Sequence, residues 1–191
     1  TGELVPQPAW TAAPEAVAAG RSAQSGLPEQ TLLLERLQVI VAALAAADPL
    51  RLQFEPAAVI ATGQNLIAGM VECLSPAGQG NASGVPPTGS GIAAALWHRL
   101  CPHAATSGQL GVLQAALVLL ADHELAASTL AARVAASVRA DPYAVVAAGL
   151  GVVGGALHGG AALGAEAMLA ETPDPREVPH GEIIPRVADV V

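Results

Sequence analysis

The sequence contains no lysine and very few aromatic residues. Its 191 residues include eight arginines against sixteen aspartates and glutamates, which gives a net charge of −8 at pH 7. A nucleic-acid surface needs clustered cations to neutralise phosphate groups, so this balance argues against a nucleic-acid-binding protein. It leaves open a small anionic substrate, because a few local hydrogen-bond donors are enough to bind one.

The pattern of β-strands is also missing. No stretch alternates apolar and polar residues with a period of two, and there is no tandem repeat. Hydrophobic residues make up 52% of the chain, and alanine is the commonest of them, with a small side chain that lets helices approach closely. The sequence therefore predicts an all-α, multi-helical bundle that forms one unit over residues 1–191, with apolar helices 107–121 and 141–170 at its centre.

Proline, glycine and the spacing of apolar residues set the expected boundaries of the helices. Helices are expected over residues 14–20, 31–47, 55–73, 90–100, 107–120, 125–138, from 141 to the glycines at 154–155, and 159–171. Ser107 is expected to cap its helix, and the inner face of the helix over 55–73 is expected to carry Val59, Leu66, Ile67 and Met70. Residues 75–90 are rich in glycine, proline and serine, so we expect a flexible surface loop there. Residues 172–191 are charged and interrupted by prolines, so we expect an irregular C-terminal segment.

Signals for secretion are absent, and those for a membrane are weak. No positively charged, apolar leader begins the sequence, and Cys73 and Cys101 are isolated, so we expect reduced thiols in a cytoplasmic protein. Residues 142–165 carry no charge and are long enough to cross a bilayer. Six glycines between Gly149 and Gly160 interrupt this run, which favours two short buried helices over the alternative of a membrane span.

Two histidines, 35 residues apart, have distinctive neighbours. His123 lies in Ala-Asp-His-Glu, just before Ala-Ser-Thr-Leu-Ala-Ala-Arg, and His158 lies in Gly-Gly-Ala-Leu-His-Gly-Gly-Ala, with Asp-Pro-Tyr between them. This order of motifs resembles the citrate synthase family, in which DHE, AST..AR, DPY and GPLHGGA follow one another. The resemblance covers about residues 110–168 and continues more loosely over 35–76. Ala156 stands where the family usually has proline.

The resemblance implies a fold, an activity and a partner. The fold would be that of the large domain, whose corresponding helices form a homodimer contact. The activity would be that of an acyltransferase, which condenses acetyl-CoA with oxaloacetate to give citrate and CoA without a metal or a tightly bound cofactor. The resemblance makes His158 the catalytic hydrogen-bond donor to the thioester oxygen and His123 a ligand of oxaloacetate.

The chemistry explains why a histidine at a helix start suits this reaction. A carboxylate must remove a proton beside the thioester carbonyl while a donor stabilises the negative charge that grows on the oxygen. A neutral imidazole can be that donor, and the positive end of a helix favours the neutral form. His158 precedes Gly159-Gly160-Ala-Ala-Leu and is expected at such a helix start.

Several parts of a complete citrate synthase are not found in the sequence. The family also uses a second oxaloacetate histidine in Gly-Phe-Gly-His, an aspartate base and further arginines, and residues 181–185 lead into Arg186 instead of that motif. The start at Thr1 lacks a methionine, so we expect that a small domain lies outside these residues. Two alternatives stay open: a 2-methylcitrate synthase that uses propionyl-CoA, and a non-catalytic dimeric paralogue that acts as a binding or regulatory module.

Other candidate residues carry less information. His98 and His103 flank Cys101, but this spacing fits no common zinc site, so a surface turn after a helix is expected there and no metal site is predicted. Ser128 and Thr129 follow His123 closely, yet no arrangement of base and oxyanion donors marks either hydroxyl as a nucleophile.

Overall fold

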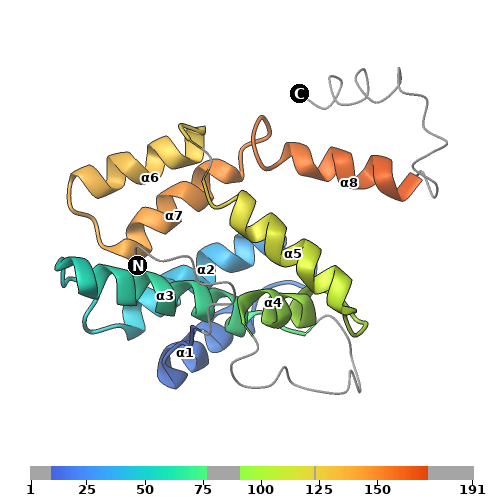
Figure 1. Ribbon diagram of the computed structural model, residues 1–191. Helices are drawn as coiled ribbons and strands as arrows, with labels where there is room; N and C mark the ends of the chain where they lie inside the picture. Colours follow the sequence, from blue (N-terminus) through green and yellow to red (C-terminus); the bar gives the residue numbers. More distant parts are fainter. Residues whose placement is uncertain (1–9, 77–90, 123, 172–191) are drawn as a thin grey trace.

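The computed structural model describes residues 10–76, 91–122 and 124–171, and within them the chain forms helices and no strand (Figure 1). The helices are α1 (Pro14–Gln24), α2 (Leu33–Ala47), α3 (Pro56–Cys73), α4 (Ile92–Leu100), α5 (Ser107–Leu119), α6 (Ala127–Ser137), α7 (Pro142–Val153) and α8 (Ala161–Glu171). The predicted all-α bundle is confirmed. Residues 77–90 of the expected loop and the expected segment 172–191 lie outside the described residues. That residues 1–191 form one unit stays a prediction.

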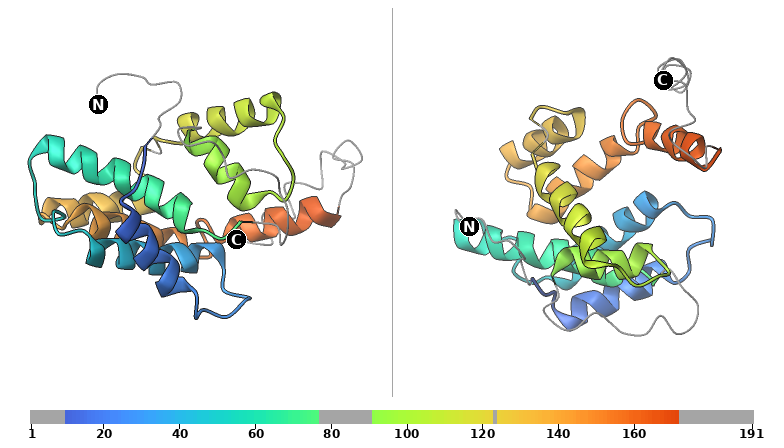
Figure 2. Two further views of the ribbon diagram at one scale, coloured as in Figure 1. Left: turned by 90° about the horizontal axis from the view of Figure 1, so that it is seen from below. Right: turned by 45° about the vertical axis from the view of Figure 1, so that its right-hand side comes forward.

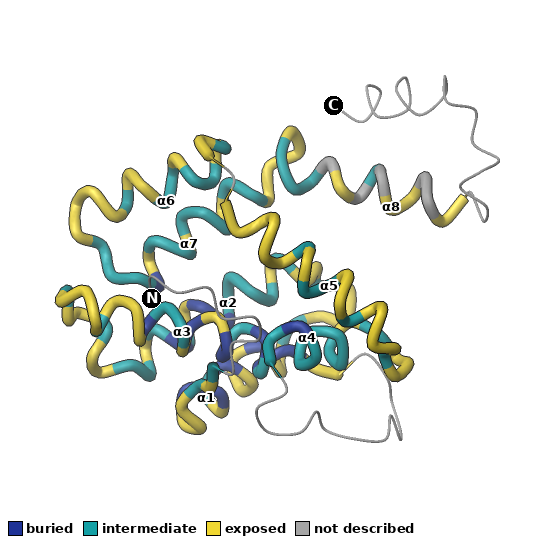
Figure 3. The backbone as a smooth tube through the Cα atoms, viewed as in Figure 1, coloured by how far each residue is buried: buried dark blue, intermediate teal, exposed yellow. Residues whose placement is uncertain are grey.

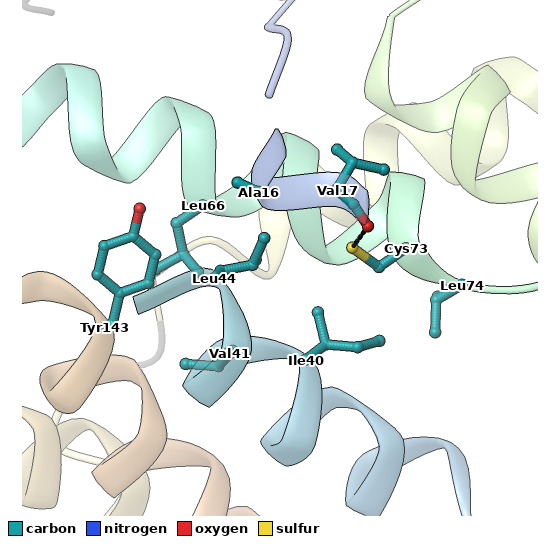
Figure 4. Packing of buried hydrophobic residues seen from close by; sticks show 9 residues of the cluster. All are labelled: Ala16, Val17, Ile40, Val41, Leu44, Leu66, Cys73, Leu74 and Tyr143. Carbon is teal, nitrogen blue, oxygen red and sulfur yellow. Dashed lines mark hydrogen bonds between the residues drawn. The ribbon is translucent and has the colours of Figure 1, made fainter. Parts of the chain in front are cut away.

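Helix α2 lies at the centre of the core, between α1, α3 and α7 (Figures 1 and 2). Its buried side chains are Ile40, Val41 and Leu44, which are at most 2% exposed. Their spacing puts them on one side of the helix, as expected for an amphipathic element. Figure 4 shows this side facing residues of α1, α3 and α7, including Val17, Leu66 and Tyr143. The apolar face of α2 therefore holds the first three helices and α7 together.

The helix over 107–121 is not at the centre, and that expectation was wrong. Helix α5 has no buried residue, and neither has α6, although both are rich in leucine, valine and alanine (Figure 3). In α7 the one buried residue is Tyr143. A helix that is apolar on every side gives no sign of which side is covered, or by what. The sequence therefore could not distinguish a core helix from one with an exposed apolar surface.

The end of α1 differs from the prediction as well. The helix continues through Gly20 to Gln24, because Gly20 gives space rather than ending the helix: a side chain there would collide with Sγ of Cys73. Past that contact, Gln24 donates a hydrogen bond to the Cys73 carbonyl, and Arg21 donates to the Glu72 carbonyl at 2.9 Å from Nη2. These side chains satisfy carbonyls at the end of α3 that have no partner within the helix.

Two local details also correct the sequence analysis. In α3, Leu66 is buried and Met70 packs against the core, as expected, but Val59 and Ile67 are 36% and 41% exposed. In α5 the capping residue is Thr106, whose hydroxyl accepts a hydrogen bond from the Gln109 backbone N–H, so Ser107 is the first helical residue.

The start of α7 is built as expected and is tied to the end of α2. The Asp141 carboxylate accepts hydrogen bonds from the backbone N–H groups of Tyr143 and Ala144 and so caps the helix. The Tyr143 hydroxyl, in a side chain only 4% exposed, donates to the Asp48 carboxylate at 2.9 Å. Burial, and then this hydrogen bond, raises the pKa of Tyr143 well above its ordinary value.

The uncharged run over 142–165 is divided by a turn at residues 154–160, so it forms α7 and α8 instead of one long helix. Among the described residues, no helix combines the length and the apolarity that crossing a bilayer requires.

The buried face of α2 leads to a prediction about stability. Replacing Leu44 by alanine should lower the free energy of unfolding by about 2–5 kcal/mol, because the lost methyl groups leave a cavity against α3. Leu52→Ala is the matched control, since Leu52 is 64% exposed, and it should change stability by less than about 0.5 kcal/mol. Urea denaturation followed by circular dichroism measures both. Equal losses for the two variants would contradict the assignment of the core.

Tyr143 is the only tyrosine in the chain, so its ionisation can be followed by tyrosinate absorbance. The folded protein should keep the phenol proton to a higher pH than the chain unfolded in guanidinium, which should titrate near pH 10. Above that pH the folded state binds more protons than the unfolded state, so the free energy of unfolding should fall as pH rises. Tyr143→Phe should remove the part of the decrease in the free energy of unfolding at alkaline pH that comes from this phenol. Coincident titration of the native and unfolded protein would refute the prediction.

Candidate functional site

Close packing of α6 against α7 brings two of the sequence motifs together. Gly149, late in α7, faces the start of α6: a side chain there would lie 3.6 Å from the Ser128 carbonyl oxygen and 3.8 Å from Cβ of Ala132. The late part of one helix therefore lies beside the early part of the other, and the pair is antiparallel. Because glycine and alanine form this contact, the backbones can approach closely and Ser128 comes near the end of α7.

The turn after α7 holds His158. The Gly155 carbonyl accepts hydrogen bonds from the backbone N–H groups of His158, at 2.9 Å, and of Gly160, at 3.1 Å. The turn lies directly against the end of the helix, because a side chain on Gly159 would be 2.5 Å from the Val153 carbonyl oxygen. A residue with a side chain at that position would push the turn away from α7. Steric crowding against the backbone therefore explains why two glycines follow His158 in the motif.

The imidazole of His158 contacts the hydroxyl of Ser128. Nε2 of His158 lies 2.8 Å from Oγ of Ser128, and both side chains are partly buried. Which group donates depends on the tautomer of the ring. Helix α8 begins at Ala161, so His158 lies in the turn that precedes the helix and not in its first turn.

Sequence reasoning did not identify Ser128 as the partner of His158. The serine belongs to the Ala-Ser-Thr motif, but 30 positions separate it from the histidine. Only the antiparallel packing of α6 on α7 shows that the two motifs share a site.

His123, the expected ligand of oxaloacetate, lies outside the described residues, so its position relative to His158 stays a prediction. A hydrogen bond joins the residues on either side of it. The Asp122 carboxylate accepts a hydrogen bond from the Glu124 backbone N–H at 2.9 Å. Glu124 has a φ of 48°, a left-handed conformation that few residues other than glycine, asparagine and aspartate adopt readily.

The segment around Cys101 is a surface turn after α4, as expected. The Trp97 indole N–H donates to the carbonyl of His103, whose side chain is exposed. The described ranges contain no group of three or more histidine, cysteine, aspartate or glutamate side chains that could hold a metal ion. Both cysteines are free thiols, with Cys73 buried and Cys101 partly exposed.

Comparisons with known proteins agree with the motifs. The citrate synthase of Saccharolobus solfataricus is 36% identical over 100 residues, which are 52% of this chain and 26% of that protein. Citrate synthase 2 of Bacillus subtilis is 35% identical over 108 residues, or 56% and 29% of the two chains. The citrate synthase of Thermoplasma acidophilum is 43% identical over 74 residues, or 39% and 19%. The chain therefore spans less than a third of the length of these relatives.

The family match extends over far more of the chain than these pairwise alignments do. Residues 9–190 match the family described as citrate synthase, C-terminal domain. This range includes the packed helices α1 to α3, the α6–α7 pair and the turn that carries His158. The chain belongs to the citrate synthase family.

Proposed function

We propose that this chain is part of an acyltransferase that condenses acetyl-CoA with oxaloacetate and releases citrate and CoA. Family membership supports this proposal, and the observation that carries it is the 2.8 Å contact between Nε2 of His158 and Oγ of Ser128. The contact joins two motifs that are distant in sequence into one partly buried polar site.

In the proposed reaction, His158 stabilises the negative charge on the thioester oxygen. If the Ser128 hydroxyl donates its proton to Nε2, that nitrogen is an acceptor and the proton of the neutral ring is on Nδ1. The Nδ1–H group is then free to donate a hydrogen bond to the thioester oxygen as the methyl carbon loses a proton. Ser128 would select this tautomer and hold the ring in place, which makes it a positioning residue.

The other roles are proposed from the family alone. His123 would bind oxaloacetate. Because the chain spans less than a third of its relatives, we propose that the aspartate base and a second oxaloacetate histidine come from polypeptide beyond these 191 residues. The reaction uses acid–base groups with CoA as a substrate, so it requires no metal and no tightly bound cofactor. We place the protein in the cytoplasm.

Two alternatives follow from the same residues. Propionyl-CoA in place of acetyl-CoA would give a 2-methylcitrate synthase. The other is a non-catalytic dimeric paralogue that binds a keto acid or CoA, and it requires that the complete gene product lack the aspartate base and the second histidine.

We further propose that the protein is a homodimer that covers the apolar surfaces of α5 and α6. Exposed residues on α6 include Leu130 and Val134, at 54% and 58%, and those on α5 include Val112 and Leu119, at 73% and 77%. Large exposed apolar surfaces of this kind commonly mark interaction sites, and a second copy of the chain would bury them.

The catalytic proposal is tested by measuring CoA thiol release from acetyl-CoA and oxaloacetate with the full-length gene product. His158→Ala should lower kcat/KM about 10²–10³-fold, because the oxyanion loses its donor. Ser128→Ala should lower kcat about 10–100-fold with little change in KM for oxaloacetate, because the imidazole loses its orientation.

Ser137→Ala is the matched control, since among the described residues the Ser137 hydroxyl bonds only the Val134 carbonyl, within α6, and it should leave kcat unchanged. Normal turnover by His158→Ala would remove His158 from the mechanism. If the wild type binds oxaloacetate in calorimetry but releases no thiol with either acyl-CoA, the non-catalytic alternative is the correct one.

The dimer proposal is tested by light scattering after size-exclusion chromatography. Val134→Glu should give monomers, because two buried carboxylates would face the interface without partners. Ile60→Glu, at a position 44% exposed on α3, introduces the same charge elsewhere and should leave the dimer intact. A monomeric wild type at working concentrations would contradict the proposal.

A further inference from the structure

A cavity of about 680 Å³ lies between α1, the end of α3 and α4, and it contains none of the residues of the His158 site. Its volume is within the range of about 300–1,000 Å³ that is typical of small-molecule sites. Three arginines line the cavity and make it positively charged, and other side chains lie beside them. The residues concerned are Arg21, Arg36, Arg99, His98, Cys73 and Leu74. An acidic chain with eight arginines and no lysine thus places three of its cations around one cavity.

Two of these arginines are held by backbone carbonyls. Arg21 donates from Nε and Nη2 to the Glu72 carbonyl, at 3.2 and 2.9 Å. Arg36 donates from Nη2 to the Pro28 carbonyl at 2.7 Å and from Nε to the Thr31 carbonyl at 3.2 Å. A carbonyl orients a guanidinium group but does not neutralise its charge. Both side chains therefore line the cavity in fixed positions with their positive charges retained.

Arg99, on α4, differs from the other two because its side chain bonds none of the described residues. Its Nε is buried without a hydrogen-bond partner, and no hydrogen bond or ion pair joins the Arg99 side chain to any described residue. Such an unpaired buried donor is uncommon in folded proteins and costs free energy until a partner is found.

The electrostatics of the cavity point to an anion as that partner. Burial, and then repulsion from the nearby Arg21, lowers the pKa of Arg99, while the Glu72 carboxylate opposes this effect. Within the described ranges, none of the three cavity arginines forms an ion pair with a carboxylate. An anion in the cavity would relieve the repulsion between Arg21 and Arg99.

We propose that this cavity binds a small molecule that carries a phosphate or carboxylate group. The guanidinium of Arg99 would be the principal donor, with Arg21 and Arg36 adding fixed positive charge. A planar guanidinium matches both kinds of anion through two parallel hydrogen bonds. Leu74, together with the partly buried Leu27, offers an apolar surface to the rest of the ligand.

Isothermal titration calorimetry of the full chain with inorganic pyrophosphate and, separately, with succinate tests this proposal and shows which anion is preferred. The wild type should bind at least one of the two saturably, with an affinity that falls as salt is added. Arg99→Gln should weaken that binding by about tenfold or more. Its fold should be unchanged, since Arg99 forms no bond to the described residues, and circular dichroism checks this.

Three further variants locate the binding. Arg139→Gln removes the same charge outside the cavity, where Arg139 lies 5.1 Å above the ring of Phe54, and it should bind like the wild type. His158→Ala should also bind normally, which separates this cavity from the proposed condensation site. If Arg99→Gln does not fold, Arg99→Lys keeps the charge without the planar fork and should still bind less tightly. Absence of saturable binding to both anions, or equal binding by the wild type and the Arg99 variants, would overturn the proposal.

Discussion

Burial of one side of α2 is the constraint on which the other elements depend. Ile40, Val41 and Leu44 contribute the best-buried large side chains of the described residues, and α1, α3 and α7 all pack around that side. The position of α7 fixes that of α6, which packs on it, and also that of the turn that follows. The geometry around His158 is therefore set by contacts that belong to the core and not to the site.

Small residues lie at the contacts between elements that lead from the core to the site. Gly20 lets α1 lie against α3, Gly159 lets the turn lie against the end of α7, and Gly149 lies where α7 meets the start of α6. A methyl group at Gly20 would collide with Sγ of Cys73, and one at Gly159 would collide with the Val153 carbonyl oxygen, whereas one at Gly149 would make an ordinary contact with the Ser128 carbonyl oxygen. The high alanine and glycine content is thus a requirement of close helix packing, and it explains how a chain with so few aromatic residues still builds a defined site.

The helices could be predicted from the sequence because their signals are local. Asp141-Pro142 at the start of α7 and Asp48 after α2 mark boundaries by their own chemistry. The roles of α5 and of Ser128 could not be predicted in the same way. The sequence of an apolar helix does not indicate which element covers it. The sequence around a serine in a helix of small residues does not indicate whether a histidine lies next to it. Both depend on contacts between segments that are distant in sequence.

The hydrogen bond between Tyr143 and Asp48 spans 95 positions, and this separation has a consequence for folding. On a ribosome, α2 emerges long before α7, so part of its apolar side stays uncovered while the intervening residues are made. The early contacts of α1 and α3 shield the remainder. Final docking of α7 closes a long loop, which is a slow step in folding. The nascent chain is therefore most exposed to aggregation between the synthesis of α3 and that of α7.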